Sequence, residues 1–192
     1  DGDRILARKK TFHVFREANK TGPYDERPML PDAIDIQLFM SRNDHAQPFH
    51  LICEKDTLLC QILGKGRVEF KGTAINYYSL TPGDYIYVPA GTPHRLIPEE
   101  ENTTVRYKAQ DAGLEGVAWY CDKCSHELFR EVWDTKETIS HEAYLWLTTK
   151  FSDNLEIRTC EECGDVHEPI DVSPYRWESV AEEIREVQAK ST

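Results

Sequence analysis

Gly83-Asp-Tyr-Ile-Tyr-Val-Pro89-Ala-Gly91-Thr-Pro-His94 combines a strand-forming run with a sharp turn. Aromatic and β-branched residues from Tyr85 to Val88 are typical of a β-strand. Proline and glycine then end the strand, because proline lacks a backbone donor and glycine tolerates turn conformations. The segment therefore predicts a strand and a turn that lead directly to a histidine.

Similar strand-forming runs occur on both sides of this segment, and short turns separate them. The turns include Gly64-Lys-Gly66, Lys71-Gly72-Thr73 and Pro82-Gly83-Asp84. Many short strands at close spacing are typical of an antiparallel sandwich or jelly roll, so we predict an all-β fold. The expected strands are residues 34–40, 58–63, 67–70, 75–80, 85–88 and 103–107.

The two ends of the chain differ from this strand-rich middle. The first 32 residues are polar and rich in proline, and they predict an arm with a short helix near residues 11–20. Near the other end, Ser173 can cap a helix with Pro174 at its first position, and apolar residues recur at helical spacing from Trp177. The predicted organisation is an arm at 1–33, a barrel at 34–116, a metal-binding extension at 117–170 and a terminal helix at 171–192.

Four cysteines form two Cys-x-x-Cys pairs, Cys121 with Cys124 and Cys160 with Cys163. Each pair places two thiolates on one tight turn, and two such pairs complete a tetrahedral site for zinc or iron. The alternative is two disulfides or two unrelated pairs. Because four thiolates leave no open coordination position, we expect the metal to be structural.

Composition limits the partners of the chain. It has 192 residues and a net charge of −11, whereas nucleic-acid binders usually carry clustered Lys and Arg. No run approaches the roughly 18 apolar residues of a membrane span, and the charged start at Asp1-Gly-Asp-Arg4 shows no signal-peptide core. We therefore expect no nucleic-acid or membrane partner, and the cysteine pairs suit a reducing cytoplasm.

Three stretches of the chain resemble the bacterial 3-hydroxyanthranilate 3,4-dioxygenases, which are cupins. The segment that ends at His94 resembles the second cupin motif, in which a strand and a Pro-Gly turn deliver a histidine into the barrel mouth. Residues 117–124 and 160–169, which contain the cysteine pairs, resemble the family's C-terminal extension. The resemblance covers residues 30 to 170 and implies a cupin jelly roll with a rubredoxin-like four-cysteine site.

The resemblance also implies an iron site in the barrel. In the family, two histidines and one glutamate hold Fe²⁺ and leave open positions for a chelating substrate and O₂. His94 matches the second histidine and His50 the first, whereas Thr57 stands where the glutamate is expected. Glu54 and Asp56 are then the candidate third ligands, and we favour Glu54.

The expected substrate-binding residues depart further from the family. Its two carboxylate-binding arginines correspond to Ala46 and Pro98, with His45 and Arg95 as nearby substitutes. A family glutamate proposed to move protons corresponds to Arg106. This reversal of charge indicates a substrate other than 3-hydroxyanthranilate, whose anionic group Arg106 meets. The alternative is a simple ion pair between Arg106 and one of the many acids.

Three functions fit these features. The favoured one is a non-haem iron oxygenase that acts with O₂ on a small aromatic or amino-aromatic substrate, with His50, His94 and Arg106 as catalytic candidates. The second is a cupin enzyme with a two-histidine metal site that performs hydroxylation, isomerisation or decarboxylation. The third is a cupin that binds its ligand without turnover. For all three, similar cupins suggest a homodimer.

Overall fold

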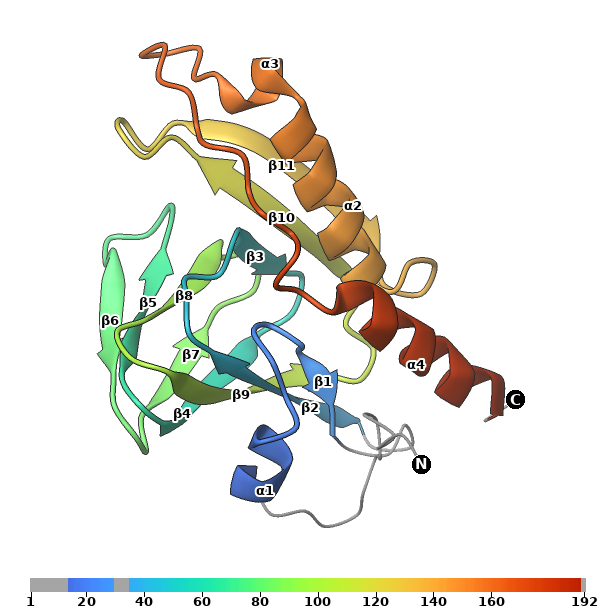
Figure 1. Ribbon diagram of the computed structural model, residues 1–192. Coiled ribbons are helices and arrows are strands. Elements are labelled where there is room, and N and C mark those ends of the chain that lie inside the picture. Colours follow the sequence, from blue (N-terminus) through green and yellow to red (C-terminus); the bar gives the residue numbers. More distant parts are fainter. Residues whose placement is uncertain (1–13, 30–34, 191–192) are drawn as a thin grey trace.

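The protein folds as a jelly-roll barrel of two antiparallel sheets, with its longer helices along one side (Figure 1). The computed structural model describes residues 14–29 and 35–190. One sheet has the strand order β1-β2-β9-β4-β7 and the other β11-β10-β3-β8-β5-β6. The strands are β1 (Arg27–Pro28), β2 (Ile36–Asn43), β3 (His50–Cys53), β4 (Thr57–Leu63), β5 (Gly66–Phe70), β6 (Tyr77–Leu80), β7 (Tyr85–Val88), β8 (His94–Pro98), β9 (Asn102–Ala109), β10 (Leu114–Tyr120) and β11 (Glu127–Asp134). The helices are α1 (Val14–Ala18), α2 (Ser140–Asp153), α3 (Leu155–Arg158) and α4 (Trp177–Lys190).

The predicted all-β jelly roll is confirmed, and the six expected strands correspond to β2, β4, β5, β6, β7 and β9. The strands that the sequence pattern missed include β3, which is buried along its whole length and so shows no alternation of polar and apolar residues. Helix α2 was also missed. It begins after Ile139 without a side-chain cap, so its start carries no sequence signal.

The predicted terminal helix exists, but its expected start was wrong. Helix α4 begins at Trp177, and Ser173 does not cap it. Instead, the Ser173 hydroxyl and backbone N–H both donate to the Asp171 carboxylate in a turn before the helix. At the other end of the chain, α1 covers the middle of the predicted helix, and the residues before Val14 lie outside the described part.

Strand pairing determines which side chains face the barrel interior. Residues directly opposite each other in an antiparallel pair point to the same face of the sheet. Arg106 of β9 pairs with Phe39 of β2 and with Leu59 of β4, so these three side chains share the inner face. Their neighbours point outward and pack against α1 in a separate apolar cluster, which contains Ala18, Met40, Cys60 and Val105.

Helix α2 covers β10 and β11, and α4 packs on α2 (Figure 1). An aromatic cluster fills the space between these helices and the sheet, and Trp177 at the start of α4 lies fully buried within it. Its ring stacks on Tyr175 with a centroid distance of 4.2 Å, and its indole N–H donates to the Tyr24 carbonyl over 3.1 Å. Trp177 thus joins the terminal helix, the sheet and the N-terminal arm.

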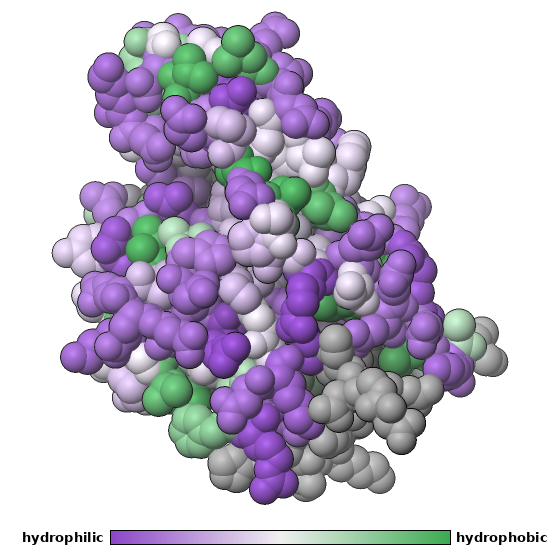
Figure 2. Space-filling model, viewed as in Figure 1, coloured by the Kyte–Doolittle hydropathy of each residue, from purple (hydrophilic) through white to green (hydrophobic). Residues whose placement is uncertain are grey.

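The outer surface is mostly hydrophilic on the face that Figure 2 shows, as the acidic composition leads one to expect. Within residues 14–29 and 35–190, every helix is too short or too polar to cross a membrane.

Replacing Trp177 by alanine is expected to lower the free energy of unfolding by about 3–5 kcal/mol, because the change leaves a large cavity in the aromatic cluster. Trp146→Ala on α2 is the matched control. Its side chain is 56% exposed, so its loss is expected to cost no more than about 0.5 kcal/mol. Urea unfolding followed by circular dichroism measures both values, and equal losses in the two variants would contradict this account of the core.

Candidate functional site

His94 points into the barrel and is fully buried. Its Nδ1 lies 2.9 Å from the Thr92 carbonyl oxygen, and its Nε2 lies 2.6 Å from Nη1 of Arg106. A carbonyl only accepts and a guanidinium only donates, so Nδ1 carries the proton and the Nε2 lone pair accepts from Arg106. Burial, and then the nearby Arg106 charge, lower the pKa of His94 to about 3. His94 is therefore neutral, and Arg106 occupies its free lone pair.

His50 does not join His94 on the inner face. The residue that pairs with His94 across β3 and β8 is Leu51, whereas His50 pairs with Ala118 of β10. The His50 ring lies against Tyr120 on the outer face, with a centroid distance of 4.9 Å. Burial, followed by the charges of nearby basic residues, lowers the pKa of His50 to about 2. The structure thus separates the two predicted iron-binding histidines.

The carboxylates considered as third ligands also lie away from His94. Glu54 is exposed, and its carboxylate accepts from the backbone N–H of Leu114. Asp56 accepts from the backbone N–H of Ala90 over 2.9 Å. Thr57 is buried on the inner face, and its hydroxyl has no hydrogen-bond partner.

The residues around His94 do not fit an iron ion. Within the described part of the chain, two groups of three or more potential ligands have their atoms within 4.8 Å of one another. Neither includes a barrel residue: one is the cysteine tetrad and the other is His126, Glu161 and Glu162 at the surface. A two-histidine, one-carboxylate site requires three ligands on one face, and the inner face offers one occupied imidazole.

The cysteine tetrad, in contrast, fits a metal. The Cys121 and Cys163 sulfurs lie 3.5 Å apart, as do those of Cys124 and Cys160, and none is in a disulfide. Each pair sits on a turn closed by a backbone hydrogen bond to its first cysteine. The residues that close these turns, Ser125 and Gly164, have φ of 63° and 73°. Four sulfur atoms so arranged match a closed tetrahedral site for zinc or iron.

Arg106 forms an ion pair inside the barrel with one of the chain's many acids, Glu26. Its Nε lies 3.7 Å from Oε2 of Glu26, and the two side chains are 2% and 6% exposed. Glu26 belongs to the N-terminal arm, where its φ of 44° places it in the left-handed region that glutamate rarely adopts. Nη1 of Arg106 donates to His94, whereas the N–H groups on Nε and Nη2 have no hydrogen-bond partner. The arm therefore delivers a carboxylate to a buried guanidinium.

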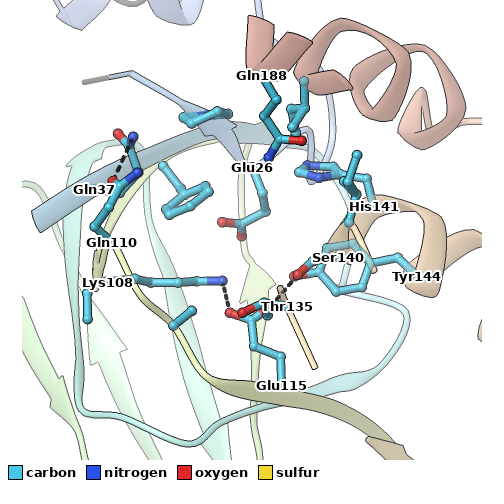
Figure 3. Close-up of a pocket in the computed structure, with 16 residues that line it drawn as sticks. Glu26, Gln37, Lys108, Gln110, Glu115, Thr135, Ser140, His141, Tyr144 and Gln188 are labelled. Carbon is cyan, nitrogen blue, oxygen red and sulfur yellow. Dashed lines mark hydrogen bonds and ion pairs between the residues drawn. The ribbon is translucent and has the colours of Figure 1, made fainter. Parts of the chain in front are cut away.

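A cavity of about 160 Å³ opens between the barrel and the helices (Figure 3). Within it, Lys108 donates to Glu115 over 2.6 Å, and Ser140 of α2 donates to the other oxygen of Glu115 over 2.7 Å. Burial alone would raise the pKa of Glu115, but Lys108 and Ser140 lower it below 4.5. Burial alone would lower the pKa of Lys108, but Glu115 raises it above 10.5. Both groups are therefore charged.

The remaining cavity wall is polar and aromatic. His141 Nε2 donates to the Asp25 carbonyl over 2.6 Å, and its Nδ1 has no partner. The rings of Phe39 and Tyr144 line the same space, and Glu26 projects into its centre (Figure 3). The cavity therefore combines flat apolar surfaces with the Lys108–Glu115 ion pair and the carboxylate of Glu26.

Glu26, Lys108 and Glu115 are site residues that were not expected from the sequence. Lys108 follows Arg106 by two residues on one strand, so the period of β9 would have placed the two cations on the same face. Glu26 carries no such signal, because its position depends on how the arm folds over the barrel.

No family model matches the chain. A 3-hydroxyanthranilate 3,4-dioxygenase of Bacillus thuringiensis is 24% identical over 163 residues, which cover 81% of this chain and 87% of the relative. That of Candida albicans is 32% identical over 126 residues, or 59% of this chain and 62% of the relative.

This chain is similar in sequence to proteins named 3-hydroxyanthranilate 3,4-dioxygenase. A cupin-2 domain protein of Shewanella frigidimarina is a solved structure that resembles it, with a TM-score of 0.40 and 16% identity over 45% of this chain and 81% of the other. Dioxygenases of this kind imply a metal. In this chain, the four-cysteine site fits a metal, and the barrel does not supply the expected iron ligands.

Removing one member of the Lys108–Glu115 pair is expected to destabilise the protein. Lys108→Met leaves a buried carboxylate without a cation, which is expected to lower the free energy of unfolding by about 3–5 kcal/mol. The double variant with Lys108→Met and Glu115→Gln has no unpaired charge and is expected to regain most of this stability. The Glu115 contribution is present above its unfolded pKa near 4.5 and is lost as pH falls through the lower folded pKa. Urea unfolding at several pH values measures both effects, and the double variant should lack this acid-dependent loss.

Cys160→Ser is expected to release the metal of the tetrad and to lower the melting temperature, because a structural thiolate site contributes directly to folding. The two remaining cysteines, Cys53 and Cys60, are buried away from the tetrad. Cys60→Ser is therefore the control, and elemental analysis should find its metal content unchanged. Equal metal contents in both variants would show that the tetrad binds no metal.

Proposed function

We propose that this protein is an oxygenase of the cupin type that acts with O₂ on a small aromatic compound without a carboxylate, rather than on 3-hydroxyanthranilate. The reaction class comes from the relatives. Proteins named as dioxygenases match 81% of the chain, and the match extends over 87% of their own length. This supports an oxygenase whose partners are a small molecule and O₂.

The paired charges of the barrel carry the proposal about the substrate. The positions of the family's carboxylate-binding arginines hold Ala46 and Pro98. The two cations near the cavity, Arg106 and Lys108, each face a buried glutamate, so their charges are already balanced. A substrate carboxylate would enter without a counter-ion, and burying an unpaired carboxylate is costly. A compound with neutral hydroxyl or amino groups avoids this cost.

The cavity offers suitable contacts for such a compound. Phe39 and Tyr144 provide flat surfaces for a ring, and the central carboxylate of Glu26 is an acceptor for a hydroxyl or amino N–H. Iron would supply oxygen activation in the relatives' reaction. The described barrel residues do not form its ligand set. The residues that line the cavity bind and orient the ring and exclude water from it.

A second candidate is a cupin that binds the same ligand without turnover. The hydrogen bond between Arg106 and His94 favours it, because this bond occupies the imidazole atom that would hold the metal. The two-histidine enzyme considered from the sequence has less support, since His50 and His94 point to opposite faces of their sheet. A homodimer and a cytoplasmic location stay predictions.

Matched ligand pairs test the proposal by isothermal titration calorimetry. 2-Aminophenol is 3-hydroxyanthranilate without its carboxylate, and catechol is 2,3-dihydroxybenzoate without its carboxylate. We expect the uncharged member of each pair to bind at least about 10-fold more tightly, or about 1.4 kcal/mol. Tighter binding of the acids would overturn the substrate class. An oxygen electrode then separates the two functions: uptake with a binding compound supports the oxygenase, and binding without uptake supports the second candidate.

Glu26→Gln should reverse this preference, because it leaves the Arg106 charge without a counter-ion. A charged hydrogen bond contributes about 1.5–3 kcal/mol, so binding of the acids should tighten about 10- to 150-fold. Glu54→Gln is the matched control, since Glu54 is an exposed glutamate away from the cavity. If both variants behave alike, Glu26 does not set the charge preference.

A further inference from the structure

We infer that the Arg106 guanidinium replaces a metal ion in the barrel, so that the interior around His94 takes up no resident iron. A bound metal ion and the basic side chain would compete here for the same atom. That atom is Nε2 of His94, which lies 2.6 Å from Nη1 of Arg106. Arginine stays charged at every physiological pH, so the competition is permanent.

The hydrogen bonds of His94 leave no second lone pair for a metal. Its Nδ1–H donates to the Thr92 carbonyl, which fixes the ring orientation as in many metal-binding histidines. The other nitrogen would then be the metal ligand, but it faces a donor instead. A metal ion would have to displace a guanidinium that is 2% exposed and ion-paired with Glu26.

The other two ligand positions are also changed. Leu51 pairs with His94 on the inner face and carries no donor atom, and Thr57 offers only a neutral hydroxyl. His50 could replace Leu51 only if β3 slipped by one residue. Such a slip turns every side chain of a strand to the opposite face, and here it would bring Leu51 and Cys53 out of the aromatic cluster.

The charges of the barrel interior also disfavour a metal ion beside His94. The interior already holds two cations and two anions in pairs, Arg106 with Glu26 and Lys108 with Glu115. A divalent ion beside Arg106 would add like charge at short range in a poorly screened interior. Recruiting Glu26 as its ligand would leave Arg106 buried without a partner, which is itself destabilising.

Metal counting tests the inference without reference to activity. An iron-free barrel favours the second candidate, binding without turnover, and the oxygen electrode decides between the two functions separately. Purified protein is incubated anaerobically with Fe²⁺, desalted and analysed by mass spectrometry for metals. We expect one metal per chain, lost in Cys160→Ser and unchanged in His94→Ala. A second equivalent that disappears in His94→Ala would overturn the inference.

A gain-of-ligand experiment tests the role of Arg106 itself. Leu51→His and Thr57→Glu restore the missing ligands, and Arg106→Glu removes the guanidinium. The triple variant is expected to bind one additional Co²⁺ with visible absorption bands, and the double variant that keeps Arg106 is expected not to. Equal binding by both would show that Arg106 does not block the site. If the triple variant does not fold, the comparison of wild type with His94→Ala still decides the question.

Discussion

The hydrogen bond between Arg106 and His94 organises the barrel interior. A guanidinium buried beside an imidazole needs a counter-ion, and Glu26 supplies it from the N-terminal arm. The arm adopts a left-handed backbone at Glu26, a conformation that costs about 1–3 kcal/mol and that the surrounding packing must stabilise. Two strand positions further along β9, Lys108 repeats the arrangement with Glu115. Arg106 thus occupies the position beside His94 that a metal ion would take.

These ion pairs also connect separate parts of the fold. Ser140, the first residue of α2, donates to Glu115, so the second pair links β9, β10 and the helix that covers them. Trp177 links α4 to the N-terminal arm, because its indole N–H donates to the backbone of the arm near Glu26. The helices therefore fix the arm that balances Arg106. The four-cysteine site holds together the outer end of the same extension, where β10 and α3 meet.

Much of the fold could be predicted from the sequence, because its signals are local. Runs such as Tyr85–Val88 and the turn before His94 specify a strand and its end, and the cysteine spacing specifies a closed metal site. The barrel site depended on information that is not local. One residue of register decides whether His50 or Leu51 faces His94, and the sequence pattern of the fully buried β3 cannot distinguish the two. The partner of Arg106 lies 80 residues away, in an arm with no regular pattern.

A cation that is part of the polypeptide behaves differently from one that is bound. Ferrous iron in an open protein site can be extracted by chelators and oxidised by the oxygen with which it reacts, and its occupancy follows supply in the cell. The guanidinium of Arg106 is made with the chain and does not change its oxidation state. The barrel therefore keeps the same positive charge under iron starvation and oxidative stress, when a metal centre in the same place would be lost.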